Sequence, residues 1–156
     1  MEIYKVKQLN NLFSYDLTIL IKQSKEEGFR FIERLVNDYK NGSNTFRNSG
    51  EALFGVFNEK EELIAIGGLN KNPYSQKQYV GRIRRFYVTK EYRRNGIGSL
   101  LIKRIIKEAV KYYKIVVLHT DTKQADHFYS SVGFLKGDLY PDSTHYIELK
   151  NYMLLN

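Results

Sequence analysis

Two glycines stand where a predicted helix begins, and they could bring a ligand close to the main chain. The stretch from Arg93 to Ser99, RRNGIGS, follows a predicted strand at 80–88 and opens a helix whose apolar residues recur at helical spacing. Because glycine within a helix costs roughly 1 kcal/mol relative to alanine, stability alone does not account for two of them here. The first amides of a helix have no internal partner, and the helix dipole makes them attractive to anions. The stretch therefore predicts a phosphate-binding turn.

A tight turn capped by Asn95 is the simpler interpretation of the same residues, because asparagine is a good N-cap. Two known phosphate motifs are excluded by the spacing. No Lys-Ser or Lys-Thr pair follows Gly98, as a Walker loop requires, and Leu101 stands where the third glycine of a dinucleotide fingerprint belongs. The pattern that remains is Arg-x-x-Gly-x-Gly, from Arg93 to Gly98.

A second pattern lies further along the chain, Ala125-x-x-Phe128-Tyr129-x-x-x-Gly133-Phe134. Combined with Arg-x-x-Gly-x-Gly after a strand that ends Phe86-Tyr87-Val88, it resembles the GNAT family of acetyl-CoA-dependent N-acetyltransferases. The order and the spacing of the two patterns are those of the family, and the resemblance covers about residues 50–150. It implies direct transfer of an acetyl group from acetyl-CoA to a primary amine within a ternary complex.

The resemblance also implies which residues hold the cofactor and which assist the reaction. The amides from Arg93 to Ser99 would hold the pyrophosphate, and the backbone of residues 86–88 would pair with the pantetheine arm as an added strand. The implied cofactor-binding residues are Phe86, Tyr87, Val88, Arg93, Arg94, Asn95, Gly96, Ile97, Gly98 and Ser99. Tyr129 matches the family's tyrosine general acid and is the expected catalytic residue; without the motif it would be one more core aromatic. Since a tyrosine pKa near 10 exceeds a thiol pKa near 8.5, a hydrogen bond to the thiolate could be its contribution.

The general base stays open. An amine with a pKa near 10.4 is mostly protonated at pH 7, a handicap of about 4.6 kcal/mol, so a group must remove its proton. Several members of the family use a glutamate on the central strand, but residues 82–85 here read Arg-Ile-Arg-Arg and contain no carboxylate. The candidates are His119, Asp121 and a water relay, with Glu51 and Glu148 as weaker ones.

Two arginines of the central strand, Arg82 and Arg84, are expected to share a strand face with Phe86. They could pair with an anionic group of the substrate or, by our preference, with an acidic residue of the protein. A small-molecule amine is the favoured acceptor because the predicted domain stands alone; a peptide N-terminus and a protein lysine remain open.

Composition narrows the protein class. The 156 residues include no cysteine, which rules out disulfides and thiolate chemistry, and only three scattered histidines, so no metal site is expected. The N-terminus has no signal-peptide pattern, and no stretch approaches the roughly 18 apolar residues of a membrane span. We therefore expect a cytoplasmic protein without a membrane partner.

The net charge of +8 points to an anionic partner. Basic residues gather around the predicted turn and the helix after it, which makes nucleic-acid binding an alternative function, though a less favoured one. Lys103, Lys107 and Lys111 lie at i, i+4 and i+8 and are most simply a solvated helix face. A non-catalytic CoA-binding module of the same fold is the other alternative.

The hydrophobic pattern predicts a mixed α/β (α+β) fold. Strands are expected at 2–8, 52–57, 63–69, 80–88, 115–119, 134–140 and 145–152, and helices from Asn11 to near Gly28, from Phe29 to Gly42, after Gly98, and at 123–131. No repeat or linker is found, so residues 1–156 are expected to form one N-acetyltransferase domain. The resemblance implies a largely antiparallel sheet of about six to seven strands with about four helices, splayed at the central strands around the cofactor. Pairing of the last strands with a second copy, giving a homodimer, stays open.

Overall fold

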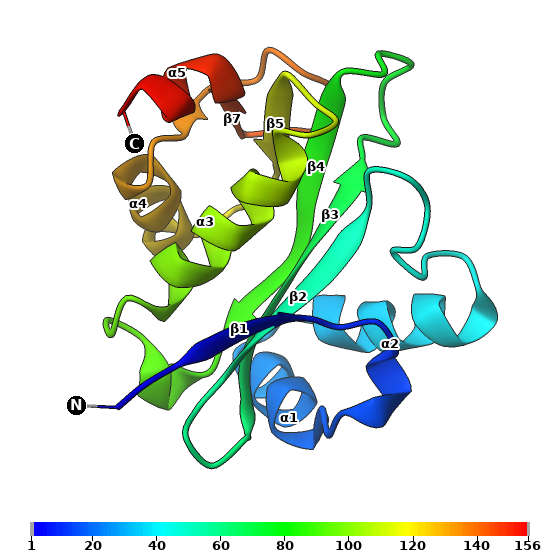
Figure 1. Cartoon of the computed structure of the whole chain (residues 1–156), viewed down its shortest axis with the longest axis vertical. Coiled ribbons are helices and arrows are strands. Elements are labelled where there is room, and N and C mark those ends of the chain that lie inside the picture. Colours follow the sequence, from blue (N-terminus) through cyan, green and yellow to red (C-terminus); the bar gives the residue numbers. More distant parts are fainter. Residues whose placement is uncertain (1, 156) are drawn as a thin grey trace.

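The strands form one seven-stranded sheet in the order β1-β2-β3-β4-β5-β7-β6 (Figure 1). This computed structural model describes residues 2–155 and the side chains of residues 2–152. The strands are β1 (Lys5–Gln8), β2 (Ala52–Phe57), β3 (Leu63–Lys71), β4 (Val80–Val88), β5 (Ile115–Leu118), β6 (Leu135–Lys136) and β7 (His145–Glu148). All neighbours pair antiparallel except β4 and β5, which are parallel. The expected mixed, largely antiparallel sheet is confirmed.

Helices cover both faces of the sheet. They are the short 3-10 turns η1 (Leu12–Ser14) and η2 (Lys90–Tyr92) and the α-helices α1 (Thr18–Glu26), α2 (Phe31–Asn41), α3 (Ile97–Ala109), α4 (Lys123–Ser131) and α5 (Leu149–Leu155). One hydrophobic core joins α3 and α4 to the sheet, and a second joins α1 and α2 to the opposite face (Figure 1). Because both faces of β2 are covered, every residue of that strand is buried.

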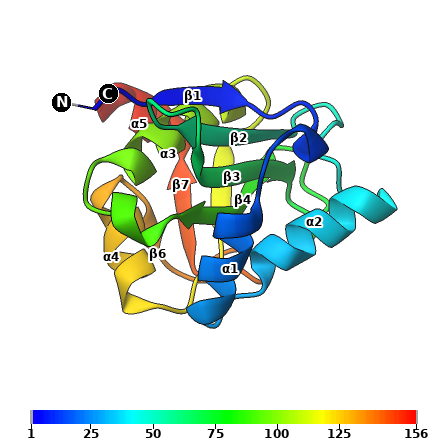
Figure 2. The same cartoon turned by 90° about the horizontal axis from the view of Figure 1, so that it is seen from below.

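The sheet opens beside the central strand β4. Pairing with β5 is confined to residues 80–82 against 115–117, whereas β4 pairs with β3 along almost its whole length. Beyond Arg82 the backbone of β4 therefore has no strand beside it on the β5 side. Figure 2 shows the same divergence, since β7 runs steeply across the direction of β1 to β4. The expected splay at the central strands is present.

A β-bulge interrupts β4 within this opening. Ile66 pairs with Tyr87 and Gly68 with Arg84, so two residues of β4, Arg85 and Phe86, lie opposite the single residue Gly67. Arg85 takes up the extra length with a φ of 58°, in the left-handed region. The bulge shifts the alternation of side chains between the two faces of the strand.

Two expected elements differ from the structure near the N-terminus. The single helix expected from Asn11 to Gly28 is wrong, because it is divided into η1 and α1. The Asn11 side chain accepts a hydrogen bond from the Phe13 amide at 3.1 Å, and the Asp16 carboxylate accepts one from the Thr18 amide at 3.0 Å. Each polar side chain starts its own short helix.

The last expected strand is too long. Strand β7 ends at Glu148, which pairs with Ile115, the first residue of β5; beyond that pair β7 has no partner, and Leu149 begins α5. The chain therefore has five α-helices among the described residues where about four were expected, and the expected strand at 134–140 shortens to Leu135–Lys136.

Candidate active site

A row of unpartnered main-chain amides spans the turn before α3 and the first three residues of the helix. Within the described part of the chain, the amides from Arg94 to Ser99 donate to no protein acceptor, and Leu100 makes the first internal bond, to the Gly96 carbonyl at 3.0 Å. The helix begins after Gly96, in the left-handed region, and no side chain caps it. The alternative that Asn95 caps the helix is therefore wrong. The turn offers a set of free donors at a helix N-terminus, the arrangement that binds phosphate.

The two glycines of this turn have different physical roles. Gly96 has a φ of 77°, and a Cβ there would meet nothing within 4 Å, so its conformation is what calls for glycine. A Cβ at Gly98 would lie 2.8 Å from two atoms of the Phe128 ring. Gly98 therefore lets α3 approach α4 closely, and Phe128 fills the space.

Arg93 is engaged within the protein. Its amide donates to the Lys90 carbonyl at 3.3 Å, and its Nε donates to the Val88 carbonyl at 3.0 Å. Its two terminal nitrogens donate to the two carboxylate oxygens of Glu27, at 2.7 and 2.5 Å. The Tyr87 hydroxyl donates to the same carboxylate. Arg93 thus ties the end of α1 to the end of β4, and the free donors of the turn begin at Arg94.

The contacts among Glu27, Arg93 and Tyr87 shift the pKa values of these side chains. The hydrogen bond from Arg93 holds the pKa of Glu27 below its ordinary value despite partial burial. Burial, and then the Glu27 carboxylate, raise the pKa of Tyr87. At neutral pH Glu27 is therefore ionised, and its carboxylate is held by Arg93 and Tyr87, which makes it unsuited to accept a proton from an amine. No local pattern identifies Glu27 as the partner of Arg93, because the two residues lie 66 positions apart along the chain.

Tyr129 lies on α4 and packs against Phe86 of β4. Its ring centroid is 5.8 Å from that of Phe86 on β4 and 5.6 Å from that of Phe134. The residue is buried, with 6% of its surface exposed. Burial raises the pKa of Tyr129 above its ordinary value, so the hydroxyl stays protonated and can donate.

A buried histidine fixes the helix that carries Tyr129. His145 on β7 contacts Asp126 on α4, with 2.7 Å between Nε2 and Oδ1, and its Nδ1 is 2.8 Å from the Thr144 hydroxyl. The His145 hydrogen bond, with a further contribution from Lys136, lowers the pKa of Asp126. The pair joins β7 to α4 one turn before Tyr129, and sequence reasoning did not identify it.

The residues expected as candidates for the general base lie in different parts of the structure. His119 and Asp121 follow β5 at the opening, 3.1 Å apart between Nε2 and Oδ1, and both are exposed. Glu51 accepts a hydrogen bond from Asn70 at 2.7 Å, and Glu148 accepts one from Asn151 at 3.2 Å. His119 with Asp121 is the pair nearest the splayed end of β5.

The expectation that Arg82 and Arg84 share a face with Phe86 is wrong. Phe86 packs with the α3 and α4 core, and a Cβ on Gly67 would lie 2.8 Å from its ring and 3.0 Å from Ile105 on α3. Arg82 points to the other face, where its Nε donates to Asn72 at 2.9 Å. The bulge between them reverses the alternation. Nor does Arg82 pair with an acidic residue, because its other bonds go to the carbonyls of Pro141 and Asp142.

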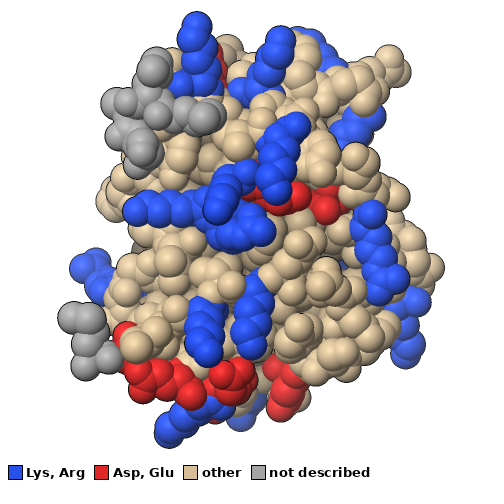
Figure 3. All heavy atoms as spheres, viewed as in Figure 1, with Lys and Arg blue, Asp and Glu red and all other residues tan. Residues whose placement is uncertain are grey.

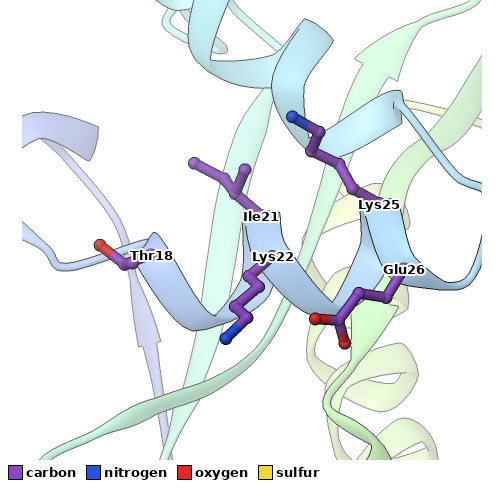
Figure 4. A pocket seen from close by; sticks show the side chains of 5 residues that line it. All are labelled: Thr18, Ile21, Lys22, Lys25 and Glu26. Carbon is purple, nitrogen blue, oxygen red and sulfur yellow. The ribbon is translucent and has the colours of Figure 1, made fainter.

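Two further surface features lie apart from these residues. A depression on α1 is lined by Thr18, Ile21, Lys22, Lys25 and Glu26, all from one helix (Figure 4). Basic side chains gather across the middle of one face, over α3, while acidic ones gather at its lower edge (Figure 3). Lys103 and Lys107 are exposed on α3, as expected for a solvated helix face, whereas Lys111, also exposed, lies in the turn after the helix ends at Ala109.

Among the described helices, none has both the length and the apolar character needed to cross a membrane. No group of three or more metal-ligating side chains is found in residues 2–152.

Comparisons with known proteins agree on one family. The profile of the acetyltransferase (GNAT) family matches residues 16–134. A protein of Exiguobacterium sp. 255-15 assigned as an acetyltransferase has a similar structure, with 31% identity, 99% of both chains covered and a TM-score of 0.88. A GNAT-family acetyltransferase of Staphylococcus aureus Mu50 gives 22% identity, 94% and 99% coverage and a TM-score of 0.75.

A chimera of the Vibrio cholerae spermidine N-acetyltransferase SpeG and hSSAT has the same fold, with 17% identity, a TM-score of 0.67 and 96% of this chain and 98% of that chain covered. No curated protein matches the chain by sequence.

Proposed function

Because this chain belongs to the acetyltransferase (GNAT) family and is an acyltransferase, we propose that it moves an acetyl group from acetyl-CoA to a primary amine of a small molecule, by direct transfer in a ternary complex. The family generally uses acetyl-CoA, which supplies the activated acetyl group as a thioester. The spermidine N-acetyltransferase of similar fold acts on an amine acceptor. The residues described above supply the other requirements of the reaction.

One observation carries the proposal. The unpartnered amides from Arg94 to Ser99 stand at the end of β4, whose backbone has no neighbouring strand beyond Arg82 on the β5 side. A diphosphate at the turn would meet several main-chain donors and the positive end of the α3 dipole. An extended pantetheine arm would continue along the open edge of residues 86–88 as an added strand. The residues present fit the cofactor.

We propose that Tyr129 and the exposed pair His119–Asp121 take part in proton transfer. We assign Tyr129 to the leaving thiolate: its protonated hydroxyl donates a hydrogen bond, which stabilises the negative charge without complete proton transfer. Removal of the amine proton is assigned to His119, to Asp121 or to a water between them and the amine. No carboxylate of β4 is available, and Glu27 is held by Arg93.

The direct test is release of CoA thiol from acetyl-CoA in the presence of single amines, combined with calorimetric titration of CoA. Turnover on at least one amine together with CoA binding supports the enzyme. A ping-pong kinetic pattern would contradict direct transfer. Arg94→Gln and Ser99→Ala should retain binding because the contacts proposed there are main-chain ones.

A non-catalytic CoA-binding module remains the second candidate, and the absence of a carboxylate from β4 favours it. The same titration separates the two: CoA binding without turnover on any amine indicates the module. Salt-sensitive binding of DNA or RNA that CoA does not displace would instead support a nucleic-acid-binding protein. A homodimer and a cytoplasmic location stay predictions.

A further inference from the structure

A row of arginines lies on the face of β4 that is opposite α3. Ile83 packs in the α3 core, so alternation directs its neighbours Arg82 and Arg84 to the other face. Arg85, in its left-handed bulge conformation, also reaches that face, where it contacts Asp38 of α2. Three cations of one strand therefore face the side covered by α1 and α2.

Arg82 is buried without an acidic partner. Only 4% of the residue is exposed, and its donors go to the Asn72 side chain at 2.9 Å and to the carbonyls of Pro141 and Asp142 at 3.1 and 2.9 Å. The Tyr74 ring lies 4.6 Å from the guanidinium carbon. These neutral groups satisfy hydrogen bonds but leave the positive charge in place.

Few carboxylates oppose the row. Arg85 and Asp38 form an ion pair at 3.4 Å, and among the described side chains Arg84 has neither an ion pair nor a hydrogen bond. Four buried side-chain atoms among the described residues have no hydrogen-bond partner, and two of them lie in or beside the row, the Nε of Arg85 and the Nδ2 of Asn72. An unpaired buried donor or charge is costly, and an anion beside Arg84 would supply the acceptor oxygens and the negative charge that the row lacks.

The arginines also act on one another. Burial, followed by the charge of Arg84, lowers the pKa of Arg85, and the charge of Arg34 on α2 lowers it further against the attraction of Asp38. Burial also lowers the pKa of Arg82, and the charge of Arg84 acts in the same direction, while Tyr74 and the Asp142 carboxylate act against it. Arg84 is thus close to both cations and lies between them.

The row lies along the strand proposed to guide the thioester. Arg84 pairs with Gly68 of β3, and Phe46 packs directly over that glycine, because a Cβ there would be 2.4 Å from its ring. Arg82 marks the last pair between β4 and β5. An anion bound at Arg84 would therefore lie beside the opening, on the face away from α3.

We infer that the acceptor amine carries an anionic oxygen group, a carboxylate or a phosphate, and that Arg84 binds this group. The inference rests on the proposed acetyltransferase function and names its acceptor class. A guanidinium offers parallel donors to two oxygens of one such group. A polyamine, in contrast, would bring further positive charge beside Arg82, Arg84 and Arg85.

Anion binding is tested first, without turnover. The protein saturated with CoA is heated with and without inorganic phosphate or glutarate at constant ionic strength, beside its Arg84→Gln and Lys107→Gln variants. Lys107 is an exposed lysine of α3 and controls for the loss of one charge. We expect either anion to raise the Tm of the wild type and of Lys107→Gln but not of Arg84→Gln. Equal Tm shifts in all three proteins would overturn the inference.

Turnover is tested with acceptors of matched length: 4-aminobutyrate, 3-aminopropyl phosphate, butylamine and 1,4-diaminobutane. We expect the two anionic amines to give the higher kcat/KM, and the preferred one identifies the group as carboxylate or phosphate. For that acceptor, Arg84→Gln should raise KM about tenfold or more with little change in kcat, and it should not affect butylamine. A preference for the diamine would overturn the inference.

The two proposals fail in different ways. Turnover of neutral or cationic amines with no anion effect would retain the acetyltransferase and discard the anionic acceptor. Anion binding at Arg84 without turnover on any amine would retain the anion site and discard the catalytic function; the acceptor assignment would then fail with it.

Discussion

The ring of Phe128 on α4 occupies the space directly over Gly98 on α3. Two of its ring atoms would lie 2.8 Å from a Cβ at that position, closer than side chains pack. The ring centroid is also 5.7 Å from that of Phe86 on β4. The absence of a side chain at Gly98 therefore allows Phe128 of α4 to pack against both the start of α3 and the open strand β4.

We expect Gly98→Ala to destabilise the protein by about 1–3 kcal/mol, because the added methyl group overpacks the contact with Phe128. Urea unfolding of the variant measures this loss. The double variant Gly98→Ala with Phe128→Leu should lose less than the sum of the two single changes, because the smaller side chain leaves room. Additive losses would show that the contact with Phe128 is not the cause.

Replacement of Gly96 should act mainly on cofactor binding. A side chain at a φ of 77° costs roughly 1–2 kcal/mol or distorts the turn, although it would meet no protein atom. We expect Gly96→Val to weaken CoA binding at least about tenfold, since distortion of the turn moves the free amides away from a common point. Calorimetric titration measures this. Unchanged CoA affinity in a folded Gly96→Val variant would contradict the proposed pyrophosphate site.

Tyr129→Phe should lower turnover while CoA affinity stays nearly the same. Loss of the hydroxyl removes the hydrogen bond to the leaving thiolate, and we expect kcat to fall about 10²-fold or more. Tyr113→Phe is the matched control: that hydroxyl donates to the Gly50 carbonyl at 2.7 Å, so its loss should cost stability but not kcat. If Tyr129→Phe is as active as the parent, another group assists the thiolate.

The pair Glu27–Arg93 should make stability depend on acid pH. The pKa of Glu27 is lower in the folded protein than its ordinary value of 4.5, so its contribution is complete above that value and is lost as the pH falls through the folded pKa. We expect Glu27→Gln to be less stable than the wild type by about 1 kcal/mol or more at pH 7.

The control for this ion pair is a double-mutant cycle that compares the stabilities of Glu27→Gln, Arg93→Gln and the double variant with that of the wild type. The difference between the wild type and Glu27→Gln should shrink as the pH falls below the ordinary value of 4.5, and it should be lost below the lowered pKa of the folded protein, where the carboxylate is protonated and the ion pair no longer forms. Denaturant unfolding at pH 7 and at pH 3 measures the free energies of unfolding that the cycle and the pH comparison require. A difference that stays constant between these two pH values would show that the ion pair does not contribute.

Local patterns predicted much of the fold. The strands β2 and β4 and the helix α4 have the bounds that their apolar periodicity and flanking polar residues predict. The turn before α3 was also identified from its glycines alone, because a helix N-terminus leaves its amides free whatever surrounds it. Signals of this kind depend on neighbouring residues, which the sequence contains in full.

The tertiary structure decided which side chains meet. The bulge at Arg85 exists only through pairing with β3, and it places Phe86 and Arg82 on opposite faces where simple alternation placed them together. The partner of Arg93 was likewise unpredictable. Glu27 lies at the end of another helix and is brought to the turn by the packing of α1 on the sheet. Backbone conformation follows mainly from local sterics, whereas the charge and contacts of a site depend on register and packing between distant segments, which no local pattern records.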